Sequence, residues 1–268
     1  MMSDAAEEGV VLETCGLTRR FGGITATDDV SLKIRKGARH ALIGPNGAGK
    51  TTLINLLAGV LKPSAGTIIL EGKDISRLAA HHRVALGLVR TFQINQLFGE
   101  LTAVQSLAMA ASARLGQSGS WWQVLGTRSD SRVAESCDRL LADFHLEDVM
   151  NQKVALLPYG KRRLLEIALA IACGPRVLLL DEPVAGVPEG ERQQILETIN
   201  ALPADVTILL IEHDMDLVFN FARSVTVLVN GAVFAEGDTR SISDDPRVRA
   251  VYLGEGYEQQ PSREAISG

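Results

Sequence analysis

A glycine-rich stretch in the first fifth of the chain has the composition of a phosphate-binding loop. It reads GPNGAGKTT and matches the spacing G-x-x-x-x-G-K-[ST]. Glycines let backbone N–H groups converge on phosphate oxygens, and the following helix points its positive end at the same anion. In this pattern Lys50 would bridge the β- and γ-phosphates, and Thr51 would ligate Mg²⁺. The stretch predicts a nucleotide site built from Gly44, Pro45, Asn46, Gly47, Ala48, Gly49, Lys50, Thr51 and Thr52.

A pair of acidic residues follows the most strand-like apolar run of the chain. The run reads VLLLDEP, residues 177–183, and delivers Asp181 and Glu182. Because α/β proteins bind ligands at the carboxyl ends of parallel strands, Asp181 could reach a metal, directly or through water. Glu182 is then the candidate general base for an attacking water. An ordinary loop after a core strand is the alternative, which a neighbouring phosphate loop disfavours.

Two further polar residues are candidates for contact with the nucleotide. The segment ILLIEHD, residues 208–214, repeats the pattern of an apolar strand with a polar end. Its His213 could donate a hydrogen bond to the γ-phosphate, because its strand should neighbour the one that carries Glu182. Gln93, in RTFQ, could bring an amide oxygen to the metal. The alternatives are a structural histidine and a surface glutamine.

A third segment raises a question of charge. In LLPYGKRRLLEIALA, residues 156–170, an amphipathic helix begins with Lys161, Arg162 and Arg163. A helix N-terminus already has partial positive charge, so three cations there are locally unfavourable. We therefore expect a negative group, from this chain or from another, to meet them.

The elements that must position these residues follow from hydrophobic periodicity. A glycine-free apolar run such as 177–180 is typical of a strand buried on both faces of a parallel sheet. Residues 101–150 instead have mainly helical periodicity, and Asn230-Gly231 predicts a type I′ hairpin. The predicted strands are Val10–Leu17, Val30–Ile34, Arg39–Ile43, Thr67–Leu70, Val177–Leu180, Val206–Ile211, Val225–Val229 and Ala232–Glu236. The predicted helices are Lys50–Gly59, Ser76–Leu86, Glu191–Leu202 and Asp214–Ala222. The order predicts an α/β core with a parallel sheet and a helical insertion.

Composition limits the class of protein. The 268 residues have a net charge of −5, which argues against nucleic-acid binding by bulk charge. The three cysteines have no metal-ligand spacing, as is usual in a reducing cytosol. No signal peptide or uncharged window of membrane-spanning length is evident, so work at a membrane would require docking on another protein.

Taken together, GPNGAGKTT, RTFQ, LPYGK, LLLDEP and IEHD resemble the nucleotide-binding subunit of ABC transporters, in order and spacing. The resemblance implies a P-loop NTPase (RecA-like) core with an antiparallel β subdomain and an inserted helical subdomain. It covers residues 10–255, with the helical subdomain at about 95–170 and flexible termini at 1–9 and 257–268. By the same resemblance the cofactors are ATP and Mg²⁺, Phe21 stacks on adenine, Glu182 is the catalytic base and His213 the switch histidine. Metal ligands would be Thr51, Gln93 and Asp181, and Gln93 would couple to the membrane subunit.

In that family two such subunits close head-to-tail, and each ATP lies between one phosphate loop and the other subunit's signature segment. Here the signature position holds Leu157, Pro158, Tyr159, Gly160 and Lys161. The negative group that meets this helix would thus be a γ-phosphate bound to a second subunit. Pro158 replaces the usual serine, Lys161 the usual glutamine, and Pro188 an Asp or Asn of the partner-contacting loop. We expect the ATP site completed by this segment to be the slower of the two.

The segments RRFGGITATDDVSL, RTFQINQLFGELTAVQSL and RAVYLGE resemble the ATPase subunits of branched-chain amino acid importers. Such importers imply as partners a second ATP-binding subunit, two integral membrane permease subunits and, indirectly, a periplasmic substrate-binding protein. The place of work would be the cytoplasmic face of the inner membrane. Related systems import urea or export lipopolysaccharide and stay open as alternatives. So do a soluble ATPase of DNA repair or translation and a weakly active regulatory cassette.

Overall fold

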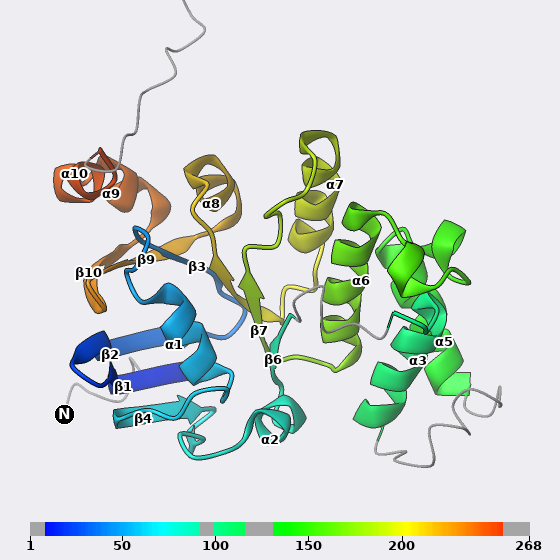
Figure 1. Ribbon diagram of the computed structural model, residues 1–268, viewed down its shortest axis with the longest axis horizontal. Helices are drawn as coiled ribbons and strands as arrows, with labels where there is room; N and C mark the ends of the chain where they lie inside the picture. The colour runs from blue at the N-terminus through cyan, green and yellow to red at the C-terminus, as the bar shows by residue number, and fades with distance from the viewer. Residues whose placement is uncertain (1–8, 92–98, 116–130, 254–268) are drawn as a thin grey trace, which may run out of the picture.

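A computed structural model describes residues 9–91, 99–115 and 131–253. Two β-sheets lie on either side of helix α1, and further helices cover the outer face of the larger sheet (Figure 1). The predicted P-loop NTPase architecture, with parallel core, antiparallel β sheet and helices to one side, is confirmed.

The larger sheet has the strand order β10-β9-β3-β8-β7-β6. Five of these strands are parallel, and β10 pairs with β9 in antiparallel fashion. At the β9–β10 turn both Asn230 (φ 50°) and Gly231 (φ 82°) are left-handed, as the type I′ prediction requires. The strands are β3 (Arg39–Ile43), β6 (Leu88–Arg90), β7 (Val177–Asp181), β8 (Thr207–Ile211), β9 (Ser224–Val229) and β10 (Ala232–Gly237).

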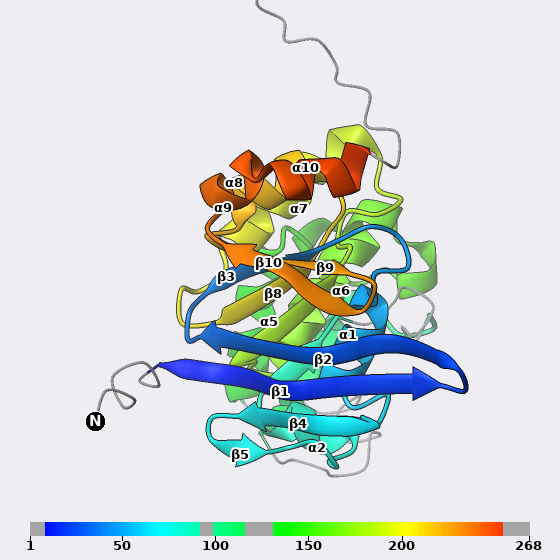
Figure 2. The ribbon, with the colours of Figure 1, turned by 90° about the vertical axis from the view of Figure 1, so that its left-hand side faces the viewer.

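The smaller sheet is antiparallel and has the order β2-β1-β4-β5 (Figure 2). Its strands are β1 (Val10–Phe21), β2 (Ile24–Arg35), β4 (Ala65–Leu70) and β5 (Lys73–Asp74). β1 and β2 extend beyond the predicted strands and meet in a tight turn at Gly22-Gly23. Hydrogen bonding across this pair keeps polar residues extended where the hydrophobic alternation fades.

Two apolar cores explain the layers. One face of β7, with Val177 and Leu179, packs with α1 and the small sheet. The other face, with Leu178 and Leu180, packs against α6, α7 and α8. Continuous apolar strands are needed because both faces are covered. The helices are α1 (Lys50–Leu57), α2 (Ala80–Ala85), α3 (Ala103–Arg114), α5 (Ser131–Asp143), α6 (Tyr159–Ala172), α7 (Glu189–Asn200), α8 (Met215–Phe221), α9 (Thr239–Asp244) and α10 (Pro246–Leu253), with 3₁₀ turns at Glu147–Val149 and Val154–Leu156.

One predicted helix is wrong in its first half. The periodicity predicts helix over Ser76–Leu86, but α2 begins only at Ala80. Asp74 accepts hydrogen bonds from the backbone and hydroxyl of Ser76, and the same hydroxyl accepts from the Ile68 N–H. Such side-chain bonds offer the backbone an alternative to helix. In the three described segments, no helix combines the length and hydrophobicity that crossing a bilayer requires.

Candidate functional site

Three strands bring the predicted site residues to one edge of the larger sheet. β8 lies between β3 and β7, with Ile211 opposite both Leu42 and Asp181. These strands are parallel, so their carboxyl ends meet at the same edge. The segments that follow them are the phosphate loop after β3, Glu182 after β7, and Glu212-His213 after β8. The convergence predicted from sequence is therefore present in the fold.

The phosphate loop needs glycine at two positions for steric reasons. Gly44 and Gly49 have φ of 153° and 98°, which side chains disfavour. An added Cβ at Gly44 would overlap the Leu228 carbonyl oxygen, and one at Gly49 would overlap the Ala26 carbonyl oxygen. The loop is thus packed directly against β9 and β2, which fixes its path.

Lys50 is the first residue of α1 and is largely buried, with 9% of its surface exposed. Its Nζ atom donates to the carbonyl oxygens of Gly44 (2.5 Å) and Pro45 (3.0 Å). The ammonium group therefore lies against the loop, close to the N-terminal N–H groups of α1. An ammonium group and a helix N-terminus together favour an anion such as a phosphate.

Asp181, at the end of β7, has a partner that the sequence did not reveal. Arg90 of β6 donates to its Oδ2 atom (2.7 Å) and also to Oδ1 of Asn55 on α1 (2.6 Å). Arg90 thereby ties the metal candidate to the phosphate-loop helix. Its place as the first residue of RTFQ was visible in the sequence, but its partners come from the pairing of β6 with β7.

Glu182 and His213 lie next to each other, as predicted. Nδ1 of His213 is 3.7 Å from Oε1 of Glu182, and both side chains are partly exposed, at 66% and 44%. Glu182 has a left-handed backbone, with φ of 47°. Non-glycine residues in this region are strained, and such residues cluster at functional sites. The carboxylate of Glu182 is partly exposed and therefore accessible to solvent.

Glu212 is a site neighbour that sequence analysis missed. Only 1% of it is exposed, and within the described chain its Oε1 atom has no hydrogen-bond partner. Its Oε2 atom accepts from the His213 N–H (3.3 Å). Burial raises the pKa of Glu212 to about 7, with a smaller contribution from the charge of Glu182. A glutamate directly after an apolar strand was the signal available.

The cations at the start of α6 have acceptors within the same chain, while the contact of this segment with a second subunit's γ-phosphate stays a prediction. Nζ of Lys161 donates to the His145 carbonyl (2.5 Å) and to Oδ1 of Asp148 (2.8 Å). Arg162 donates to the Leu157 carbonyl (3.0 Å). The segment before α6 folds back over the helix and supplies these acceptors, so the expected negative group is in part the Asp148 carboxylate of this chain.

The signature segment also contacts the loop that follows Glu182. The Tyr159 hydroxyl donates to the Ala185 carbonyl (2.9 Å). A Cβ at Gly160 would overlap the carboxylate of Glu191 at the start of α7. Pro158 occupies the N-cap position of α6 and makes no side-chain cap. The N–H groups in the first turn of α6 therefore receive no side-chain cap from residue 158.

Arg163 turns inward from the same helix. It donates to the carbonyl oxygens of Glu182 (2.9 Å) and Pro183 (3.0 Å) and to Oε2 of Glu166 (2.7 Å). Glu166 has no exposed surface, and burial raises its pKa although Arg163 opposes the shift. A charged residue inside the apolar run of α6 was the sequence signal for this pair.

Phe21 and Gln93 are two further site residues predicted from sequence. Phe21, at the end of β1, is 43% exposed, and the guanidinium of Arg19 lies 4.6 Å from its ring centroid. Its role as an adenine platform stays a prediction. Gln93 and the predicted flexible ends lie outside the described residues, apart from Gly9.

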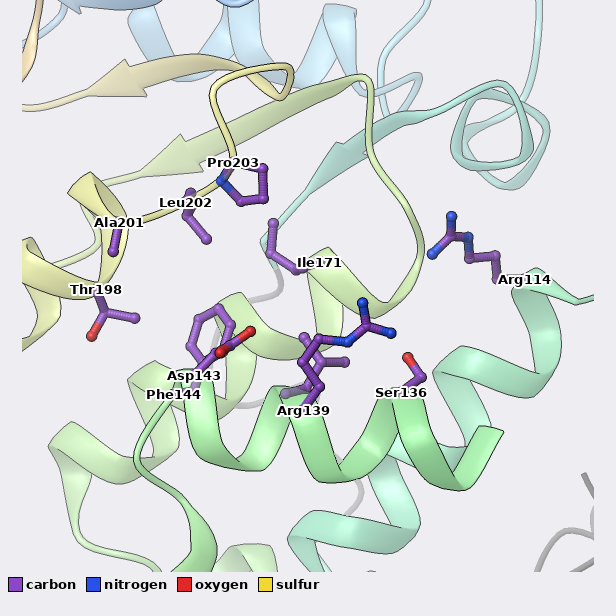
Figure 3. Close-up of a pocket in the computed structure, with 11 residues that line it drawn as sticks. Arg114, Ser136, Arg139, Asp143, Phe144, Ile171, Thr198, Ala201, Leu202 and Pro203 are labelled. Carbon is purple, nitrogen blue, oxygen red and sulfur yellow. The ribbon is translucent and has the colours of Figure 1, made fainter. Parts of the chain in front are cut away.

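A pocket of about 310 Å³ lies elsewhere, between α5 and the end of α7 (Figure 3). Arg139 and Asp143 of α5 line it, and Leu202 and Pro203 lead from it into β8. Leu202 and Pro203 precede β8, so the pocket lies near the amino end of that strand, opposite the end that the phosphate loop follows. None of the predicted nucleotide residues lines it, so it is separate from the candidate nucleotide site.

Comparison with known protein families yields two matches. Residues 27–185 match the model of the ABC transporter family. Residues 232–258 match the model of the branched-chain amino acid ATP-binding cassette transporter. The first match spans the phosphate loop, the signature segment and the acid pair. The second covers β10 and the helices that follow it.

Individual relatives match over nearly the full chain. The high-affinity branched-chain amino acid transport ATP-binding protein BraF of Pseudomonas aeruginosa is 40% identical, over 91% of this chain and 98% of its own. The corresponding protein LivG of Escherichia coli is 39% identical with the same coverage. Among solved structures, an ATP-binding cassette of an ABC transporter in its ADP conformation superposes with a TM-score of 0.79. It is 32% identical, over 91% of this chain and 99% of that one.

Proposed function

Because the chain belongs to the ATP-binding cassettes of the ABC transporter family and is an ATPase of that kind, we propose that it powers an importer of branched-chain amino acids or related small amino acids and amides. The main observation behind the ATPase role is that Lys50, Glu182 and His213 follow neighbouring parallel strands at one edge of the sheet. The transported class is inferred from the relatives, since the substrate does not contact a cassette. Residues 10–255 form the nucleotide-binding domain in this proposal, with the helical subdomain at about 95–170.

The proposed chemistry divides among the residues of this edge. The loop Gly44–Thr52 and the start of α1 hold the phosphates, with Lys50 on the β- and γ-phosphates. Glu182 takes a proton from a water whose oxygen attacks the γ-phosphorus, and the bond to the β-phosphate breaks to leave ADP. His213, beside Glu182, donates to the γ-phosphate. Phe21 stacks on the adenine.

The donor set near the phosphate loop fits a magnesium ion. Thr51 and Asp181 offer hydroxyl and carboxylate oxygens, the ligands that this hard cation prefers, and Gln93 would add an amide oxygen. When bound, Mg²⁺ would neutralise charge on the phosphates. Arg90 holds one oxygen of Asp181, so it orients the carboxylate beside the loop.

We propose that a second ATP-binding subunit completes the site. Leu157–Lys161 would face the γ-phosphate bound by that subunit, with the backbone N–H groups and dipole of α6 as donors. Lys161 contributes less to this contact than its charge indicates, because Asp148 already pairs with it. The assembled pair would act beneath two permease subunits at the cytoplasmic face of the membrane, supplied by a periplasmic binding protein.

ATP turnover by the full-length chain in the assembled pair of subunits tests the proposed catalytic role. Glu182→Gln should lower kcat by at least about 100-fold, since it removes the base, and should leave ATP binding intact. Glu135→Gln, the same change on the exposed face of α5, is the matched control and should keep wild-type turnover. Equal turnover in Glu182→Gln and wild type would refute the assignment.

The transported class needs a separate experiment. Cells that express the complete transporter should take up labelled leucine, isoleucine or valine, and uptake should stop with Glu182→Gln. Uptake of urea but not of these amino acids would move the system to the alternative substrate class without affecting the ATPase assignment.

A further inference from the structure

Arg163 makes an unusual set of contacts for a residue outside the phosphate loop. Its three donor groups reach the Glu182 carbonyl (2.9 Å), the Pro183 carbonyl (3.0 Å) and Oε2 of Glu166 (2.7 Å). Only 9% of Arg163 and none of Glu166 is exposed. One buried guanidinium therefore joins α6 to the backbone of the proposed catalytic base.

This arrangement is costly if its only purpose is stability. Two charges taken out of water lose their hydration, and a buried ion pair often stabilises no more than apolar residues of the same volume. The cost is higher here because, within the described part of the chain, Oε1 of Glu166 has no hydrogen-bond partner. A specific geometric role would account for an ion pair at this position.

The backbone of Glu182 needs such a constraint. Its φ of 47° lies in the left-handed region, which side chains disfavour. Its N–H donates to the Ile211 carbonyl (3.0 Å), which fixes one side of the residue. Its carbonyl oxygen accepts from both Arg163 and the Ala185 N–H (3.0 Å), which fixes the other. The direction of the carboxylate depends on this backbone conformation.

We propose that Arg163, held in place by Glu166, is a positioning residue for ATP hydrolysis. It fixes the left-handed backbone of Glu182 and so aims the carboxylate at the attacking water. The inference rests on the proposed role of Glu182 as general base. Small displacements of reacting groups reduce rate more than binding, so the effect belongs in kcat and not in ATP affinity.

The experiment compares single and double variants of the full-length chain in the assembled pair of subunits. Arg163→Met should lower kcat by about 10- to 100-fold, with KM for ATP within about twofold of wild type. Arg163→Lys, which keeps the charge but has a single ammonium in place of the planar fork, should give an intermediate kcat. The double variant Arg163→Met with Glu166→Leu replaces the pair by apolar side chains, so it should regain stability in urea while kcat stays low.

Arg39 provides a matched control. It also donates to loop carbonyls, those of Leu202 (2.8 Å), Pro203 (3.2 Å) and Val206 (2.5 Å). It lies at the start of β3, at the opposite edge of the sheet from Glu182. Arg39→Met should therefore lower stability but leave kcat of the folded protein at the wild-type value.

The possible outcomes separate the inference from the proposed function. Wild-type kcat in the double variant would mean that the pair serves stability alone, and would overturn the inference. If Arg163→Met does not fold, the double variant decides in the same way. If instead Glu182→Gln hydrolyses ATP as fast as wild type, the base itself is misassigned, and the inference falls with it.

Discussion

The buried carboxyl group of Glu212 makes stability depend on pH in a defined direction. Burial raises its pKa from 4.5 to about 7. The folded chain therefore holds this proton more tightly than the unfolded chain does. The contribution is fully present below about pH 4.5 and is lost as pH rises through about 7, where the folded carboxyl ionises. Glu182 nearby adds to the cost of that ionisation.

The size of the effect follows from the shift. At about 1.4 kcal/mol per pKa unit, a shift from 4.5 to about 7 corresponds to about 3 kcal/mol. Glu212→Gln removes the charge while it keeps an acceptor for the His213 N–H. The new amide also brings N–H groups into a buried place, which reduces the gain. We expect Glu212→Gln to be more stable than wild type by about 1–3 kcal/mol at pH 8.5, and no more stable at pH 4.5.

Urea denaturation followed by circular dichroism, at several pH values, measures this difference. Burial also raises the pKa of Glu166. Subtraction of the wild-type curve removes the contribution of Glu166 and leaves the effect of Glu212 on stability. Glu135→Gln, an exposed substitution of the same kind, is the control and should show no comparable divergence. A Glu212→Gln curve that runs parallel to wild type at every pH would refute the argument from burial.

Three further predictions concern other residues. Gly44→Ala should abolish ATP binding and destabilise the fold, because the new Cβ overlaps the Leu228 carbonyl oxygen. Gly47→Ala, with open space around it, should lower the free energy of unfolding by only about 1–2 kcal/mol. Urea denaturation measures the stability of both variants, and a fluorescent ATP analogue measures their binding. Pro158→Ser should add an N-cap to α6, stabilise the chain by about 0.5–2 kcal/mol and raise ATPase in the assembled pair, and an unchanged rate would end that explanation. Burial lowers the pKa of His40 to about 4. Wild type should therefore lose stability as pH falls from 6.5 towards 4, and His40→Gln should lose less stability over that interval.

Patterns with a local cause were predictable from sequence. The path of the phosphate loop requires positive φ angles, and Gly44 and Gly49 adopt them. The Asn230-Gly231 turn has the backbone that its composition demands. The apolar strands that precede Asp181 and His213 were sufficient to place both residues at one edge. In each case the determinant lies within a few residues of the feature.

Features that depend on distant partners were not predictable. Arg90 and Arg163 acquire their significance from acceptors that are remote in sequence, and Glu212 acquires its own from burial and from the charge of Glu182. The helix predicted from Ser76 fails because the Ser76 hydroxyl donates to Asp74 and accepts from the Ile68 N–H of β4. Periodicity reports which face of an element is buried, but it does not identify the partner of a buried polar atom.

The cations at the start of α6 show how such partners change a functional argument. Asp148 and the His145 carbonyl engage Lys161, and backbone carbonyls engage Arg162 and Arg163. A phosphate that arrives at this helix would therefore meet mainly backbone N–H groups, not unpaired positive charge. Pro158 contributes no N–H and no hydroxyl there. The phosphate loop of the same chain keeps its glycines and its lysine, so we expect the two nucleotide sites of an assembled pair to differ in strength, with the weaker one built on this chain's signature segment.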